Sequence, residues 1–178
     1  MPELLDARRR PDAAANPTGQ PGWGGSRRTQ TLMARVLIVG YGNPLRGDDG
    51  LGWHAARRLS ENMRREDVEI LTCHQLTPEL AERLSRVDRV IFIDAACTGA
   101  PGEVLQQAIQ PDMSAAADFT HHFDIPALLA CAQILFGACP QAVLCSVAAE
   151  TFDLTESLSP AVEAAVPKLL ELVHRLLD

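Results

Sequence analysis

Acidic and histidine side chains occur at three places in this chain where a predicted strand ends or a predicted helix begins. The adjacent Asp48 and Asp49 lie in a glycine-rich loop after a run of branched apolar residues, Asp94 ends a second apolar run, and the adjacent His121 and His122 precede a helical pattern. Because strand ends and helix starts of this kind meet at one edge of a sheet, we expect side chains from the three places to converge. Two carboxylates and one imidazole leave coordination positions open, which suits a divalent transition metal such as nickel or zinc.

The loop that carries Asp49 begins abruptly. The apolar run 36–39 predicts a short strand buried on both faces, and the glycines of the stretch 40–52 break that pattern and permit positive φ angles and close approach to a ligand. Asp48 has two interpretations. We favour the cap of the following helix over a neighbour that orients metal ligands.

A dinucleotide fingerprint is the rival interpretation of the same loop, because Gly40-Tyr41-Gly42 follows a predicted strand. The third glycine of G-x-G-x-x-G would fall on Leu45, and two carboxylates would face the phosphates that a helix N-terminus attracts. A nucleotide-binding α/β domain is therefore the less favoured alternative.

Asp94 also has a structural interpretation, as a turn residue or a helix cap. A carboxylate at the end of an all-apolar strand is costly to bury unless it is paired or bound to a metal. The residues alone leave both interpretations open.

The rest of the chain alternates between strand and helix patterns. We expect strands at 36–39, 68–73, 89–94, 103–109 and 142–148, and helices at 51–65, 77–85, from 125 onward and at 160–177. Thr77, Asp124 and Ser159 are the expected N-caps. The alternation predicts an α/β fold, with a doubly wound, mostly parallel twisted sheet of about five strands and helices on both faces. We expect the segment 150–158 to be a loop that covers the site.

Four motifs, in order, connect this chain to a known family. They are Gly-Tyr-Gly-Asn-Pro-Leu-Arg-Gly-Asp-Asp-Gly-Leu-Gly at 40–52, Ile-Phe-Ile-Asp-Ala at 91–95, Thr-His-His-Phe-Asp at 120–124 and Leu-Ser-Pro-Ala-Val at 158–162. Together they resemble the motifs of the hydrogenase maturation endopeptidases. The resemblance extends over nearly the whole chain from Met33 to the end.

The resemblance implies an endopeptidase that removes the C-terminal peptide from the nickel-loaded precursor of a [NiFe]-hydrogenase large subunit. In the family, the position of Asp49 is Glu or Asp, and with the positions of Asp94 and His122 it contacts nickel already inserted into the substrate. The spacing to the Gly-x-x-Pro at 137–140 matches His122, rather than His121, to the family's ligand. Nickel would thus be carried by the substrate, and no organic cofactor is expected. A non-catalytic nickel- or peptide-binding chaperone that uses the same three residues is the alternative.

The chain departs from the family pattern after its second predicted strand. His74 and Gln75 stand where the family members resembled here carry small glycine and threonine residues. We expect this difference to affect how the substrate peptide is held. Glu150 is a further candidate for contact with the substrate.

The composition is that of a globular chain with an acidic body. Its 178 residues, 47% apolar and 22% charged, suffice for one domain with a real core. The first 35 residues carry six arginines against three acidic residues, so the net charge of −7 leaves −10 on residues 36–178. This acidic body argues against nucleic acid as a partner, and no apolar run approaches the roughly 18 residues that a membrane span needs.

The N-terminal stretch differs in composition from the rest. Residues 1–32 are rich in Arg, Ala, Pro and Gly and contain no Ile, Val or Phe, so we expect a disordered or mis-assigned extension, with Met33 as a possible true start. Residues 33–178 are expected to form a single α/β protease domain. Five cysteines without a C-x-x-C pair suit a reduced cytoplasm.

Overall fold

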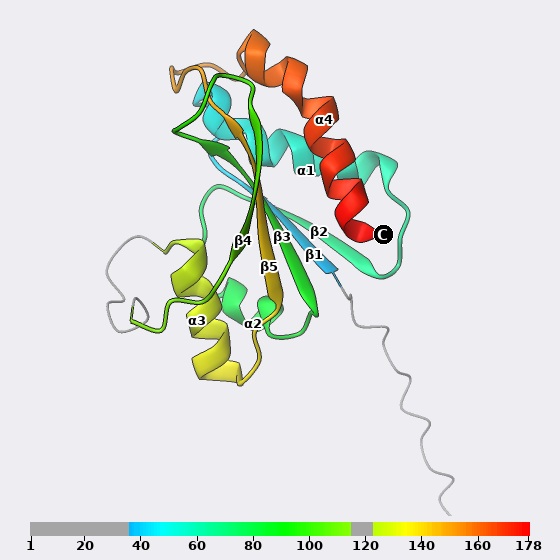
Figure 1. The fold of residues 1–178 in the computed structure, drawn as a ribbon, viewed down its shortest axis with the longest axis vertical. Coiled ribbons are helices and arrows are strands. Elements are labelled where there is room, and N and C mark those ends of the chain that lie inside the picture. The colour runs from blue at the N-terminus through cyan, green and yellow to red at the C-terminus, as the bar shows by residue number, and fades with distance from the viewer. Residues whose placement is uncertain (1–35, 115–122) are drawn as a thin grey trace, which may run out of the picture. The chain divides into compact units, whose positions relative to one another are not determined.

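A computed structural model of the protein describes residues 36–114 and 123–178, whose strands form one sheet of order β2-β1-β3-β5-β4 (Figure 1). The strands are β1 (Val36–Tyr41), β2 (Val68–Cys73), β3 (Arg89–Ala96), β4 (Val104–Ile109) and β5 (Gln141–Ala148). Neighbouring strands are parallel except β4, which pairs antiparallel with β5 at one edge. The predicted α/β class with a mostly parallel five-stranded sheet is confirmed.

Helices cover both faces of the sheet, as predicted. They are the 3-10 helix η1 (Gly47–Gly50) and the α-helices α1 (Leu51–Asn62), α2 (Leu80–Leu84), α3 (Ile125–Phe136) and α4 (Pro160–Leu177). Figure 1 shows α1 and α4 on one face and α2 and α3 on the other, and the two apolar clusters divide in the same way. None of the helices in the described ranges is long and apolar enough to cross a membrane.

The central strands contribute to two separate cores. Ile38 and Ile91 pack with α1 and α4, whereas Leu37 and Phe92 pack with α2 and α3. These four side chains are almost completely buried. A central strand covered on both faces needs no polar side, which explains why the run 36–39 is apolar without alternation.

Two of the longer helices begin where their capping signals predict. The Asp124 carboxylate accepts the Ala127 N–H at 2.9 Å, and the Ser159 hydroxyl accepts the Val162 N–H at 3.3 Å. A proline follows within the first turn of each helix, where its missing N–H costs no hydrogen bond. These caps place the start of α3 and the start of α4.

The expected cap of the second helix at Thr77 is wrong. α2 begins at Leu80 without a side-chain cap. The Thr77 and Pro78 carbonyls instead accept the N–H groups of Leu80 and Ala81, at 3.1 and 3.0 Å, in a turn that precedes the helix. A proline preceded by a polar residue is equally compatible with a β-turn, so the local signal was ambiguous.

Candidate active site

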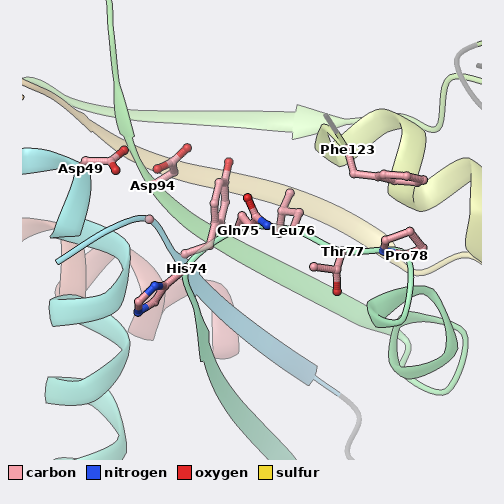
Figure 2. A pocket seen from close by; sticks show the side chains of 10 residues that line it. Asp49, His74, Gln75, Leu76, Thr77, Pro78, Asp94 and Phe123 are labelled. Atoms are coloured by element: carbon pink, nitrogen blue, oxygen red, sulfur yellow. The ribbon is translucent and has the colours of Figure 1, made fainter. Parts of the chain in front are cut away.

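A cavity of about 400 Å³ opens at the carboxyl ends of β1, β2 and β3. Its lining residues are Tyr41, Gly42, Asp49, His74, Gln75, Leu76, Thr77, Pro78, Asp94 and Phe123. Figure 2 shows Asp49 and Asp94 at one end of this cavity and Pro78 and Phe123 at the other. The cavity therefore has an acidic end and an apolar end, at the sheet edge where parallel α/β proteins bind ligands.

Asp49 reaches the cavity from η1, which follows the loop after β1. Its carboxylate accepts the backbone N–H of Asn43 at 3.0 Å and so closes the intervening loop. Gly42 has a φ of +125°, and a Cβ at this position would collide with the carbonyl oxygen of Asp49. A glycine is therefore required for the loop to fold back and place Asp49 beside the end of β1.

Asp94 lies inside β3, where it pairs in register with Ser146 of β5. The interpretation as a turn residue or helix cap is therefore wrong. Burial raises the pKa of Asp94 to about 6; hydrogen bonds from the Tyr41 hydroxyl and the Ala95 N–H oppose the rise, and the charge of Asp49 adds to it. The two cavity carboxylates are close enough to repel each other.

Tyr41 is a site residue that the sequence reasoning missed. It ends β1 and packs edge-to-face on Phe92, with ring centroids 6.4 Å apart, and its hydroxyl hydrogen-bonds to Asp94. Burial and then the charge of Asp94 raise the pKa of Tyr41, so the hydroxyl stays protonated and donates to the carboxylate. The available signal is its position between two glycines at the end of the strand, in the first family motif.

Asp48, directly before Asp49 in the chain, faces the interior. It is fully buried, and neither η1 nor α1 has a side-chain cap, so the favoured role as a helix cap is wrong. Burial acts to raise the pKa of Asp48, but hydrogen bonds from the backbone N–H groups of Ser159, Glu150 and Thr151 outweigh it, and the pKa lies below its usual value. Two adjacent aspartates thus have opposite surroundings.

His122, the third predicted ligand, and its neighbour His121 lie outside the described residues. The described chain resumes at Phe123, which lines the cavity, and at Asp124, which caps α3. Among residues 36–114 and 123–178, no group of three or more His, Cys, Asp or Glu side chains is arranged to hold a metal ion.

His74 and Gln75 both line the cavity, in the connection that follows β2. In Figure 2, the His74 ring points away from the carboxylates of Asp49 and Asp94. The departure from the family pattern therefore changes the wall of the cavity rather than its acidic end.

The β5–α4 connection (149–159) contains the segment that was expected to cover the site. The residues of this connection do not line the cavity. Its backbone instead hydrogen-bonds to Gly47 and Asp48, which do not line the cavity, so the expectation that this segment covers the site is wrong. Glu150 is exposed, and its backbone N–H is one of the donors to Asp48.

Several solved structures that share this fold are hydrogenase maturation proteases. HybD from Escherichia coli, a hydrogenase maturating endopeptidase, is 28% identical over 80% of this chain and 91% of that chain, with a TM-score of 0.63. HycI from Thermococcus kodakarensis is 27% identical over 81% and 92% of the two chains, with a TM-score of 0.65. The hydrogenase 2 maturation peptidase from Thaumarchaeota archaeon SCGC_AB-539-E09 is 29% identical over 80% and 97%, with a TM-score of 0.63. In fold, the chain is therefore similar to α/β maturation peptidases.

The profile of the hydrogenase maturation protease family (HycI) matches residues 53–176. The chain therefore belongs to the hydrogenase maturation protease family, which is a family of peptidases. The matched stretch includes Asp94 and Ser159, and it begins just after Asp49. No curated protein sequence matches the chain.

Proposed function

We propose that this protein is an endopeptidase that removes the C-terminal peptide from the nickel-loaded precursor of a [NiFe]-hydrogenase large subunit. Family membership and the names of the solved relatives support peptidase action in hydrogenase maturation. The observation that carries the proposal is the convergence of Asp49 and Asp94, from two different sequence motifs, at the acidic end of one cavity. The proposed partner is the precursor, and we propose neither nucleic acid nor a membrane as a further partner.

We assign contact with the substrate's nickel to Asp49, Asp94 and His122. The charge of Asp49 raises the pKa of Asp94, and a cation between the two carboxylates would relieve this repulsion. Two carboxylates leave further coordination positions for an imidazole and for groups of the substrate. Recognition of the metal would then report that assembly of the precursor is complete.

In this proposal, residues of the chain hold the two cavity carboxylates in fixed positions. The Tyr41 hydroxyl and the Ala95 N–H hold Asp94, and the Asn43 N–H holds Asp49. Asp49 and Asp94 would hold a divalent metal carried by the substrate, which would supply polarisation of the scissile carbonyl or a lower pKa for an attacking water. Side chains fixed before the substrate arrives need no reorganisation during the reaction.

The rest of the cavity suits an extended peptide. Leu76, Pro78 and Phe123 offer apolar contact, while Gln75 and Thr77 offer hydrogen-bonding groups. A volume of about 400 Å³ accommodates a few residues rather than a folded segment. The scissile bond must therefore lie in a chain end or an open loop, which agrees with removal of a C-terminal peptide.

Incubation of the purified protein with nickel-loaded and nickel-free precursor tests this function, with loss of the C-terminal peptide read by mass spectrometry. We expect cleavage of the nickel-loaded precursor only, and loss of cleavage in Asp49→Ala, Asp94→Ala and His122→Ala. Asp153→Ala, at an exposed position, is the matched control. Binding without cleavage of a cognate precursor would favour the chaperone, and equal cleavage of both forms would contradict metal recognition.

We further propose that residues 33–178 form the protease domain and that the protein acts in the cytoplasm. The five cysteines are all unpaired, and a reducing compartment keeps thiols in that state. The proposed partner must occupy the same compartment, because it is the substrate that the protease cleaves.

A further inference from the structure

Asp48 connects two segments that are far apart in the sequence. Its Oδ2 accepts the N–H groups of Glu150 and Thr151, at 2.8 and 3.1 Å, and its Oδ1 accepts the Ser159 N–H at 2.7 Å. The side chain is 0% exposed, so these donors replace the water that a carboxylate would otherwise bind. Its charge is therefore stabilised by the backbone of the β5–α4 connection, which lies 102 to 111 residues later in the chain.

Backbone hydrogen bonds reinforce the same contact. The Gly47 N–H donates to the Thr155 carbonyl at 2.7 Å, and the Asp48 N–H donates to the Thr151 carbonyl at 3.2 Å. Gly47 has a φ of +54°, and a Cβ there would lie 3.3 Å from the carbonyl oxygens of Thr151 and Asp153. The β5–α4 connection, which contains no helix or strand, is thus held at its beginning, middle and end.

Ser159, in the last sequence motif, contacts Asp48, in the first motif. Its hydroxyl caps α4 by accepting the Val162 N–H, and its own N–H donates to Asp48. Asp48 is therefore hydrogen-bonded to the start of α4, a long helix whose apolar side chains pack in the core. The first and last motifs meet at this carboxylate.

The contacts of Asp48 also affect the position of Asp49, the next residue in the chain. Asp49 lies in η1, a four-residue 3-10 turn that leads directly into α1, so the position of its backbone depends on the contacts that hold η1. We propose that Asp48 is a positioning residue of the protease: by binding the β5–α4 connection, it holds the backbone of Asp49 so that the Asp49 carboxylate faces the cavity. Its catalytic consequence rests on the proposed function. Asp48 itself does not line the cavity and acts only through Asp49.

Two pairs of variants isolate this role. Asp48→Asn keeps the side-chain shape but removes the charge and one acceptor, and Asp153→Asn makes the same change at an exposed position of the same connection. Ser159→Pro removes the N–H that donates to Asp48, at a φ of −61° that proline adopts. Ser159→Ala keeps the N–H and removes only the hydroxyl, which caps α4 and also hydrogen-bonds to Asp48. The difference between the proline and alanine variants therefore isolates the N–H.

Residue-resolved amide exchange by NMR reads the geometry without any substrate. In Asp48→Asn we expect the amides of Glu150, Thr151 and Ser159 to exchange at least about tenfold faster, because each loses a charge-assisted acceptor. The amide of Asn43, which donates to Asp49, should show the same acceleration. Amides of β3, which exchange through global unfolding, should accelerate only as far as the loss of global stability requires, and all amides in Asp153→Asn should be unchanged.

Cleavage of the nickel-loaded precursor reads the catalytic consequence, at a temperature where each variant is fully folded. For Asp48→Asn we expect kcat to fall at least about tenfold while KM changes less than about twofold. A merely structural role would lower the melting temperature and leave the kcat of the folded protein unchanged. If Asp48→Asn does not fold, amide exchange and cleavage kinetics are measured on Ser159→Pro and its alanine control instead.

The outcomes separate this inference from the proposed function. An unchanged Asn43 amide, or faster exchange with an unchanged kcat, would overturn the positioning role. If the wild-type protein cleaves no cognate precursor, the proposed function fails, and the exchange of Asn43 alone decides whether Asp48 positions Asp49.

Discussion

The carboxylate of Asp48 is fully buried and that of Asp94 is partly buried, yet their surroundings shift the two pKa values in opposite directions. Asp48 accepts three backbone N–H groups, and its pKa lies below its usual value. Asp94 accepts two hydrogen bonds but has the charge of Asp49 close by, and its pKa rises to about 6. Because burial acts to raise both values, the difference comes from the neighbouring groups.

This difference separates a carboxylate that stabilises the fold from one that costs stability at neutral pH. Asp48 has donors supplied by the chain itself, so its charge needs no ligand. Asp94 and Asp49 repel each other in a cavity that is open to a cation. Such an unfavourable arrangement is typical of a functional site.

The largest expected effect is on catalysis. Asp94→Ala and Asp49→Ala should each reduce cleavage of the nickel-loaded precursor by about a thousandfold or more, on the order of 4 kcal/mol of transition-state stabilisation. The fold should persist, because the change removes a repulsive carboxylate. Single-turnover cleavage with parallel thermal unfolding measures both quantities. Residual activity within about tenfold of wild type would show that the cavity carboxylates are not essential.

The next effect is on stability and belongs to Asp48. Asp48→Ala leaves three backbone N–H groups without their acceptor, so the free energy of unfolding should fall by about 3–5 kcal/mol. Urea denaturation measures this loss. The control Asp153→Ala should stay within about 0.5 kcal/mol of wild type. An equal loss in both variants would remove the contrast between Asp48 and an exposed carboxylate.

The pH dependence of stability should have opposite signs for the two carboxylates. The folded pKa of Asp94, about 6, lies above the unfolded value of about 3.9, so its stabilising effect is present below about pH 4 and is lost as the pH rises through 6. Asp48, whose folded pKa is depressed, stabilises above about pH 4 and loses that effect as the pH falls through its folded pKa.

Asp94→Asn tests this sign. In metal-free buffer, its advantage over wild type in unfolding free energy should grow between pH 4 and pH 7 to about 2–3 kcal/mol. Urea denaturation at pH 4, 5.5 and 7 measures the difference. A difference that does not vary with pH would contradict the raised pKa of Asp94.

The smallest effect is expected for Tyr41→Phe. This change removes the hydroxyl that donates to Asp94 and keeps the ring that packs on Phe92. We expect kcat/KM to fall about tenfold, since a group that orients a ligand is lost, with stability changed by less than about 1.5 kcal/mol. Steady-state cleavage measures the first quantity and urea denaturation the second. An unchanged kcat/KM would show that Asp94 needs no hydroxyl donor.

Much of the fold followed from local patterns. The strand at Val68–Cys73 has its predicted bounds, and the caps Asp124 and Ser159 begin their helices as expected. These signals are local, because a strand's apolar period and an N-cap depend on residues within a few positions. The β3 strand was harder to delimit: it continues two residues beyond Asp94 because β5 pairs with it as far as Ala96.

The candidate site was predicted only in part. Its two described carboxylates were selected from their positions after apolar runs together with the family resemblance, and both line one cavity. Tyr41 was missed because its role depends on a neighbour in β3, on which the residues around Tyr41 in the sequence carry no information. The proposed metal contact by His122 stays a prediction.

By itself the sequence determined the alternation of strands and helices and the presence of carboxylates at the strand ends. The family resemblance selected Asp49 over Asp48 for the site, and only the tertiary structure shows why the two adjacent aspartates differ. Asp48 and Asp49 have the same local signal, and their surroundings differ because the donors to Asp48 come from the β5–α4 connection, more than 100 residues away. Side-chain roles that depend on such distant partners cannot be read from neighbouring residues.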